Sequence, residues 1–314
     1  MSDSAPDGGN TGDTAPRSLR VLVAGASGFI GSELTRQLEA DGHTVQKLVR
    51  RLPEAANESQ WNPATGQIDL EVVEAADAVI SLGGTSISRI PWTPKYVRGL
   101  RSSRVRVTKT LVDAMHAVNT PPEVFLSASA VGFYGDRPGE DLDEESPRGE
   151  GILADISERW EAEAIAAPAQ TRVVRFRTGL VVGEGGAFGP LGLLTRFGLG
   201  SRIGTGQQYW PWIALYDEAA AIRHLLTSKL AGAVNLEGPV PATSEQITTR
   251  LAKAMHRPHL LAIPEFVITT VMGAAGRELL LPDTRIIPKR LLDDGFEFRY
   301  PTADSIIDAT WGKD

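Results

Sequence analysis

Three glycines, Gly25, Gly28 and Gly31, recur at every third position in the stretch VLVAGASGFIG near the start of the chain. Glycines at such a turn let backbone N–H groups approach a pyrophosphate, and a helix that begins there directs its positive end at the same charge. The spacing therefore predicts a dinucleotide-binding turn, although a glycine-rich turn without a ligand would contain the same residues. The predicted cofactor contacts of the turn are Gly25, Ser27, Gly28, Phe29, Ile30 and Gly31.

Two arginines, Arg50 and Arg51, follow the next apolar run, HTVQKLV. An acidic residue about 20 residues past the glycines usually binds the ribose 2′-hydroxyl of NAD, whereas an arginine there accommodates the 2′-phosphate of NADP. A guanidinium binds that phosphate through paired hydrogen bonds, and a carboxylate would repel it. We therefore predict NADP(H) rather than NAD(H), with Arg50 as the main contact and Arg51 as a residue that shares or replaces its role. The alternative is a solvated loop arginine.

The elements around these residues alternate between strand and helix. LRVLVAG is typical of a buried parallel strand, SGFIGSELTRQLEADG has helical spacing, and HTVQKLVR alternates as a second strand. Further strands are predicted in ADAVISLGG, EVFLSASAVGFYG and TRVVRFRTGLVVG, with helices between them. This order predicts an α/β fold with a Rossmann-like, doubly wound parallel sheet and function at the carboxyl ends of its strands. One such end, Leu82, Gly83 and Gly84, is expected beside the cofactor.

Composition divides the chain into three parts. Residues 1–18 are rich in Ser, Asp, Gly, Pro and Thr, and they cannot bury apolar surface, so a disordered tail is predicted. Residues 19–182 carry the alternating elements of an NADP-binding core. From about Gly183 the chain is rich in glycine and aromatic residues. We interpret 183–314 as loop-rich substrate-side segments and a small C-terminal lobe, interleaved with the core.

The totals exclude several classes of function. The chain has 314 residues, a formal net charge of −7, five histidines and no cysteine. An acidic chain disfavours nucleic acid and anionic membranes as partners, and the histidines lack the spacing of metal ligands, so no metal site is predicted. There is neither a long apolar run nor the basic and apolar regions of a signal peptide at the start. We expect a soluble, cytoplasmic protein that binds a small molecule, with a protein partner or a homo-oligomer left open.

The span from Leu19 to about Ala309 resembles the extended short-chain dehydrogenase/reductase superfamily, and within it the atypical, SulA-type branch of NAD-dependent epimerase/dehydratase-like proteins. The resemblance rests on GASGFIG, AVISLGGTSI, LSASAVGFYGD with the DEESP that follows it, GTGQQYWPWI, and PKRLLDDGFEFRYP. The first stretch is shared by the whole superfamily, and the last three together are much more specific. The resemblance implies a Rossmann-like core, a small C-terminal substrate-side lobe and an NADP-type cofactor, without supplying a substrate.

The proton relay of that superfamily is missing from this chain. Active members use a Ser or Thr and a Tyr-x-x-x-Lys motif, in which the tyrosine moves the proton and the lysine lowers the pKa of the tyrosine. The matching helix here reads GILADISERWEAEA, which puts Leu153 at the tyrosine position and Ser157 at the lysine position. None of the five tyrosines has a lysine four residues later.

Hydroxyl groups at the end of EVFLSASAVGFYG are the nearest substitutes. Ser129 lies one residue upstream of the place of the superfamily serine, and it is predicted to orient a substrate carbonyl or hydroxyl, with a structural hydroxyl as the alternative. Tyr134 follows on the same loop as a second catalytic candidate, and its alternative is a packing aromatic. Ser127 is a predicted substrate contact.

Two further substrate contacts, Gln207 and Trp212, are predicted in the stretch QQYWPW. Amide donors beside flat apolar faces suit a cleft for a small ligand. The alternative is core packing of a loop by Trp210 and Trp212.

Two functions compete. The first is an NADP(H)-dependent oxidoreductase or epimerase-like enzyme that acts on a small carbonyl, quinone or nucleotide-sugar-like substrate. The second is a non-catalytic NADP(H)-binding regulatory protein, linked to cell division, in which cofactor occupancy sets a conformation that a partner recognises. The missing relay favours the second function. The serines at the strand end and the aromatic stretch favour the first, which we prefer.

Overall fold

A seven-stranded parallel sheet forms the centre of the protein, in the order β12-β7-β5-β4-β1-β2-β3. The computed structural model describes residues 17–312. The strands of the sheet are β1 (Arg20–Ala24), β2 (Thr44–Val49), β3 (Glu58–Gln60), β4 (Ala78–Ser81), β5 (Val124–Ala130), β7 (Arg172–Thr178) and β12 (Gly232–Leu236). This arrangement confirms the predicted doubly wound α/β fold.

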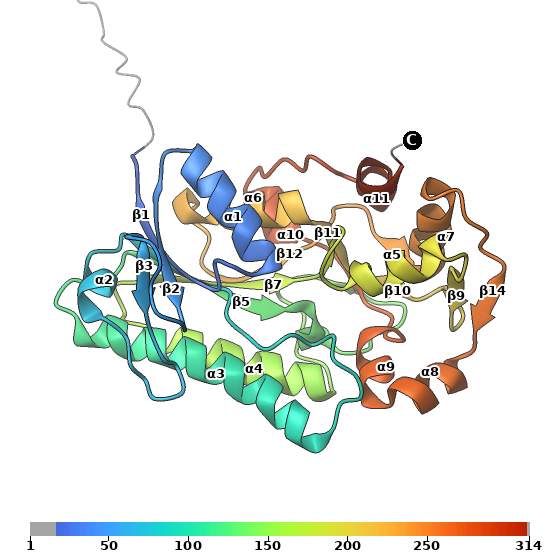
Figure 1. Ribbon diagram of the computed structural model, residues 1–314, viewed down its shortest axis with the longest axis horizontal. Coiled ribbons are helices and arrows are strands. Elements are labelled where there is room, and N and C mark those ends of the chain that lie inside the picture. Colours follow the sequence, from blue (N-terminus) through green and yellow to red (C-terminus); the bar gives the residue numbers. More distant parts are fainter. Residues whose placement is uncertain (1–16, 313–314) are drawn as a thin grey trace, which may run out of the picture.

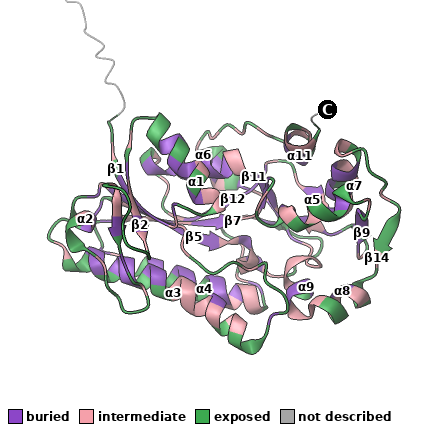
Figure 2. Cartoon of the chain, in the orientation of Figure 1, coloured by how far each residue is buried: buried purple, intermediate pink, exposed green. Residues whose placement is uncertain are grey.

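Helices cover both faces of the sheet (Figure 1). One face carries α1 (Phe29–Ala40) and α6 (Leu215–Thr227), and the other carries α2 (Leu70–Glu74), α3 (Pro94–Ala117) and α4 (Ile152–Ile165). Successive side chains of a strand point to opposite faces, so β1 serves both layers. Val21 and Val23 join the core under α1 and α6, while Leu22 and Ala24 join the core under α3. Figure 2 shows the central strands buried.

The strand order reverses at β1, which pairs with β2 on one side and with β4 on the other. In open α/β sheets, such a reversal leaves a crevice outside the carboxyl ends of the two strands, because the helices that follow them leave in opposite directions. The glycine turn follows β1, and Leu82 follows β4. The fold therefore brings these two predicted segments to the same crevice.

The remaining elements form a smaller lobe, seen at the right of Figure 1. They pair in short two-stranded sheets around a separate apolar core that includes Phe188, Trp212 and Ile307. The lobe and its connections comprise β6 (Asp141–Leu142), β8 (Leu180–Val182), α5 (Phe188–Arg196), β9 (Ser201–Ile203), β10 (Tyr209–Trp210), β11 (Trp212–Ala214), β13 (Ala242–Thr243), α7 (Ser244–Ala254), β14 (Leu261–Ile263), α8 (Glu265–Met272), α9 (Ala274–Leu279), β15 (Arg285–Ile286), α10 (Lys289–Asp293) and α11 (Ala303–Trp311).

Two of the expectations differ from the structure. The segment after Gly183 was expected to be loop-rich, yet it contains α5 and three short strands. Glycines within α5 lower its intrinsic helix propensity, and the burial of Phe188 against the lobe compensates for it. The predicted tail lies mostly outside the described residues, but Arg17 and Ser18 are described, and Arg17 pairs with Asp77 at 2.9 Å.

No helix within residues 17–312 is long and apolar enough to cross a membrane.

Two acidic side chains are buried where the sheet meets the lobe. Glu218 of α6 is 0% exposed and Glu237, just after β12, is 2% exposed. Thr178 Oγ1 donates a hydrogen bond to Glu218 Oε1 at 2.7 Å, while Oε2 of each glutamate has no hydrogen-bond partner among the described residues. Burial raises the pKa of Glu218 to about 8 and raises the pKa of Glu237 well above its ordinary value. The Glu218 carboxyl is therefore mainly protonated at neutral pH.

Glu218 should make the protein less stable as the pH rises. The folded-state pKa of about 8 lies above the ordinary value of 4.5, so between these values the folded state binds a proton that the unfolded state has lost. The stabilisation that Glu218 contributes to the folded state is complete below pH 4.5 and disappears as the pH rises toward about 8. The free energy of unfolding changes over this range by at most about 1.4 kcal/mol per pH unit. Urea unfolding at several pH values should show a flatter profile for Glu218→Gln than for the wild type.

The exposed Glu297 provides the matched control, and Glu297→Gln should keep the wild-type profile. Equal slopes for Glu218→Gln and the wild type would contradict the assignment of the buried proton to Glu218.

Candidate functional site

A cleft of about 1370 Å³ lies at the reversal point of the sheet. The ends of β1, β2 and β4 form its floor, the loop after β3 closes one end, and one face of α3 forms a wall. Its volume exceeds that of a typical small-molecule pocket and suits an elongated ligand. The predicted cofactor residues that line it are Gly25, Ser27, Gly28, Arg50, Arg51, Leu82, Gly83 and Gly84.

The glycines of the turn are required by space and by conformation. Gly25 has a φ of +93°, and a Cβ there would lie 3.1 Å from the carbonyl carbon of Leu82. A Cβ on Gly31 would lie 2.1 Å from the carbonyl oxygen of Gly25, closer than any real contact. The turn therefore packs tightly against the start of α1 because neither residue has a side chain.

The start of α1 is open toward the cleft. Its N-cap residue is Gly28, which has no side chain to bond the first amides, and the first turn carries no acidic residue. The first N–H groups of a helix lack partners within the helix, and they carry partial positive charge. The cleft thus offers unfilled amide donors to an anion at the place where the glycine spacing predicted a pyrophosphate.

The side chains of two predicted contacts, Phe29 and Ile30, and the Cα of Gly31 do not line the cleft. Gly31 packs against the turn itself, and Ile30 packs against the core under α1. The ring of Phe29 lies against the loop after β8, where a Cβ on Gly183 would come within 2.8 Å of it. Their side chains shape the turn, and the predicted contact of their backbone N–H groups with a cofactor stays a prediction.

The two arginines after β2 differ in their surroundings. Arg51 donates to both carboxylate oxygens of Glu58 at 2.8 Å, and this pairing holds the pKa of Glu58 at about 2. Arg50 forms no hydrogen bond or ion pair with another side chain in the described part of the chain, and it lines the same cleft. Arg50 is therefore the arginine whose guanidinium is available to a ligand.

The helix that carries the tyrosine in the superfamily begins under a side chain from the C-terminal lobe. Glu278 of α9 accepts hydrogen bonds from the backbone N–H groups of Ile152 at 2.9 Å and Leu153 at 3.1 Å. The N-cap residue Gly151 has a φ of +115°, and a Cβ there would lie 2.9 Å from the Glu278 carboxylate. Sequence reasoning missed this contact, because nothing local in the sequence relates two positions so far apart.

Leu153 and Ser157, at the tyrosine and lysine positions, contribute no proton relay. Leu153 is half-buried and packs over Gly132, where a Cβ would lie 2.8 Å from that of Leu153. Ser157 is buried within α4. At the position where the superfamily has its tyrosine, the first turn of α4 therefore makes an apolar contact.

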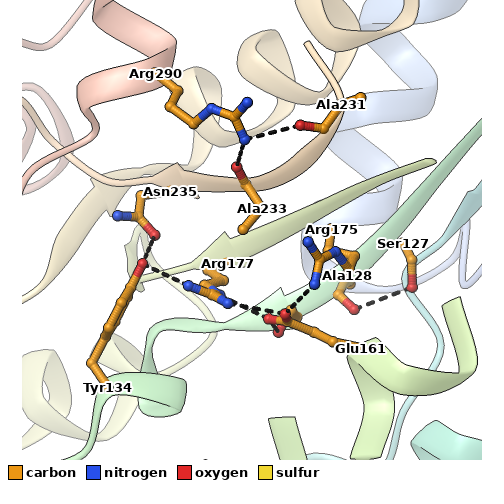
Figure 3. A network of polar contacts seen from close by, with 11 residues as sticks. Ser127, Ala128, Tyr134, Glu161, Arg175, Arg177, Ala231, Ala233, Asn235 and Arg290 are labelled. Atoms are coloured by element: carbon orange, nitrogen blue, oxygen red, sulfur yellow. Dashed lines mark hydrogen bonds and ion pairs between the residues drawn. The ribbon is translucent and has the colours of Figure 1, made fainter. Parts of the chain in front are cut away.

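Tyr134 lies in a buried polar network around Glu161 and Arg177 (Figure 3), and Ser129 joins this network through Glu161. Ser129 Oγ donates to Glu161 Oε1 at 2.7 Å, and Arg177 donates to both oxygens of that carboxylate at 2.8 and 3.0 Å. Arg177 also donates to the Tyr134 hydroxyl at 2.9 Å, and that hydroxyl donates to Asn235 Oδ1 at 2.7 Å. The network connects α4, β7, β12 and the 3-10 turn η1 (Val131–Tyr134) beneath the ends of the strands.

The burial of these hydroxyls argues against the predicted catalytic roles. Tyr134 is 0% exposed, Ser129 is 3% exposed, and neither lines the cleft. Burial raises the pKa of Tyr134 to about 12, which makes it a poor acid or base at neutral pH. Ser127 is fully buried as well and donates to the carbonyl of Ala128. The geometry favours the structural alternative for all three residues.

The stretch QQYWPW divides in the structure. Trp212 is fully buried in the lobe core, and its Nε1 donates to the carbonyl of Val240 at 3.0 Å, so it does not form a cleft wall. Gln207 is exposed outside the lining of the large cleft, and its substrate contact stays a prediction.

The Glu161 carboxylate should be the most sensitive group of the network. Glu161→Gln would leave Arg175 and Arg177 without the charge that both contact, and breaking a buried ion pair costs about 3–5 kcal/mol. We expect a loss of that order in the free energy of unfolding, measured with urea.

Glu158→Gln on the same helix is the control, because its exposed carboxylate pairs only at 3.4 Å with Arg148 and should change stability by less than about 1 kcal/mol. If the two substitutions lower the free energy of unfolding equally, the buried network adds no more stability than an exposed ion pair.

Comparison with known proteins shows to which family the chain belongs. Residues 21–237 match the NAD dependent epimerase/dehydratase family, and residues 263–310 match a domain of unknown function, DUF1731. An epimerase family protein of Mycobacterium leprae is 38% identical over 291 residues, which cover 92% of this chain and 94% of the relative. The human epimerase family protein SDR39U1 is 31% identical over 293 residues, covering 90% of this chain and 96% of the relative.

Solved structures agree with this placement. The crystal structure of human SDR39U1 (isoform 2) with NADPH has a TM-score of 0.85 and 30% identity, and covers 93% of this chain and 99% of that one. A Thermus thermophilus UDP-glucose 4-epimerase complex with NAD has a TM-score of 0.69 at 19% identity, covers 93% of this chain and 97% of that one, and shows the fold alone. The predicted resemblance is confirmed: this chain belongs to the NAD dependent epimerase/dehydratase family, and within it to the SDR39U1-type, oxidoreductase- or epimerase-like proteins.

Proposed function

We propose that this chain binds NADP(H) in the large cleft and uses it to reduce a small carbonyl or quinone substrate. The observation that carries the proposal is the presence, in one cleft, of an open glycine turn and of Arg50, which has no side-chain partner within residues 17–312. The human relative that was crystallised with NADPH supports the phosphorylated cofactor over NAD.

The residues of the cleft fit an NADP-type dinucleotide. The open amides at the start of α1 and the backbone of Gly25 and Gly28 would hold the pyrophosphate. Arg50 would hold the 2′-phosphate through paired, charge-assisted hydrogen bonds. Leu82, Gly83 and Gly84 would form the floor beside the adenosine, since they end β4 next to the turn. When bound, the cofactor supplies or accepts a hydride.

The proton side of the reaction limits the substrate class. Epimerisation through a hydroxyl group requires a base that removes the hydroxyl proton, and the tyrosine position holds Leu153. Ser129 and Tyr134 are enclosed in the network around Glu161. A substrate whose reduced form is stable as an anion, such as a quinone, can take its proton from water. Reduction of such a carbonyl therefore suits these residues better than epimerisation of a nucleotide sugar.

A second candidate, a non-catalytic NADP(H)-binding regulator, is favoured by the same burial of Ser129 and Tyr134. On that alternative, the cleft binds cofactor and a partner protein recognises the loaded form.

Arg50→Glu should abolish the preference for NADPH. Charge reversal at the 2′-phosphate replaces an attraction by a repulsion, so we expect NADPH affinity to fall by about 100-fold while NADH affinity changes little. Tryptophan fluorescence titration of the protein with each nucleotide measures both constants. Arg159→Glu, an exposed change outside the cleft, is the control. The cofactor proposal fails if the wild type binds neither nucleotide.

A panel of quinones and small carbonyl compounds tests the reaction. The wild type should oxidise NADPH, followed by its absorbance, with at least one quinone, and Tyr134→Phe should retain most of that turnover because the hydroxyl does not reach the cleft. A partner that binds only the NADPH-loaded protein, together with no turnover on any compound, would replace the enzyme by the regulator.

A further inference from the structure

A second cation without a partner among residues 17–312 lines the cleft, on the wall that α3 forms. Arg106 lies on α3, is exposed and lines the cavity. It makes no hydrogen bond, ion pair or ring contact with another described residue, within residues 17–312. Sequence reasoning did not single it out, because it lies in a helix that carries several other arginines.

The neighbouring cations are already engaged. Lys47 pairs with Glu39 at 3.6 Å, and Arg51 is held by Glu58 at 2.8 Å. Arg104, on the same helix, donates to the backbone carbonyls of Thr85 and Leu100 at 3.1 Å and lies over the ring of Trp160. Among the cations that line the cleft, Arg50 and Arg106 are those without a carboxylate partner in the described structure.

The other side chains on the face of α3 that carries Arg106 are short. Residues 99, 102, 103, 106 and 107 line the cleft at helical spacing, and apart from Arg106 they are Gly99, Ser102, Ser103 and Val107. A Cβ on Gly99 would have nothing within 4 Å, and both serine hydroxyls donate to backbone carbonyls of α3. Arg106 is therefore the long side chain of this wall, with open space beside it.

The loop after β3 places Arg106 and Arg50 at the same end of the cleft. The N–H of Trp61 donates to the carbonyl of Val49, the residue before Arg50, at 2.9 Å. Two residues further, the carbonyl of Pro63 accepts from Thr110 Oγ1 at 3.5 Å, one helical turn beyond Arg106. The loop thus spans from the strand end that carries Arg50 to the part of α3 that carries Arg106.

The charge of this end supports an anionic ligand. The lining of the whole cleft includes Lys47, Arg50, Arg51 and Arg106 against the single carboxylate of Glu58, in a chain whose formal net charge is −7. Two guanidinium groups without partners would repel each other unless an anion lies between them. A phosphate monoester carries close to two negative charges at neutral pH and offers three acceptor oxygens.

We infer that Arg106 is a second contact for the 2′-phosphate of NADP(H), so that cofactor selectivity rests on α3 as well as on the end of β2. The inference depends on the proposed function. Arg106 selects between cofactors by its charge and donors, and it takes no part in the reacting end of the cleft.

Binding of four nucleotides tests the inference without any need for turnover. Wild type, Arg106→Ala and Arg106→Glu are titrated with NADPH, NADH, 2′-phospho-AMP and AMP, with melting temperature as a check of folding. We expect Arg106→Ala to weaken NADPH and 2′-phospho-AMP by about tenfold, and to change NADH and AMP by less than about twofold. Arg106→Glu should weaken the two phosphorylated ligands further, because it adds a repulsive charge.

Lys109→Ala is the matched control on the same helix, since Lys109 pairs with Asp113 at 2.8 Å and does not line the cleft. Equal losses for phosphorylated and unphosphorylated ligands would assign Arg106 to the adenosine and overturn the inference, and so would unchanged binding of all four. If the wild type binds neither NADPH nor NADH, the proposed function fails first. If the wild type prefers NADPH and Arg106→Ala binds all four nucleotides as the wild type does, only the role of Arg106 is overturned.

Discussion

The close approach of Gly31 to the carbonyl of Gly25 is the contact on which the site depends. A single methyl group at position 31 would lie 2.1 Å from that oxygen, so the first turn of α1 reaches the end of β1 only because the side chain is absent. This approach directs the open amides of α1 at the crevice between β1 and β4, where the strand order reverses. Arg50, Leu82 and the face of α3 line one cleft together with this turn.

Much of the core could be predicted because its determinants are local. The period of apolar residues in β1, α1 and β2 lies within one stretch of sequence, and the glycines mark their turn directly. The same reasoning failed for α5, whose glycines suggest a loop and whose helix depends on burial of Phe188 against distant parts of the lobe. It also assigned catalysis to Ser129 and Tyr134 from the position of their hydroxyls. Their partners, Glu161, Arg177 and Asn235, come from three other elements, and no local pattern relates them.

The network around Glu161 explains why the hydroxyls of Ser129 and Tyr134 are buried away from the cleft. Arg177 must donate its hydrogen bonds somewhere once it is buried on β7, and the oxygens of Glu161 and Tyr134 accept them. Ser129 completes the set by donating to the same carboxylate. The ends of the strands therefore have two roles in this protein. The ends of β1, β2 and β4 line the cleft, and side chains near the ends of β5 and β7 form hydrogen bonds with the buried carboxylate of Glu161.

The cap that Glu278 places on α4 has a consequence for how the chain is made. Glu278 emerges from the ribosome 126 residues after Ile152, and its carboxylate accepts a hydrogen bond from the N–H of Ile152. At about 5–20 residues per second, the start of α4 waits on the order of ten seconds for its carboxylate. The sheet can assemble during that interval, while the first turn of α4 stays uncapped. A segment that is synthesised after every strand of the central sheet therefore completes a helix of the core.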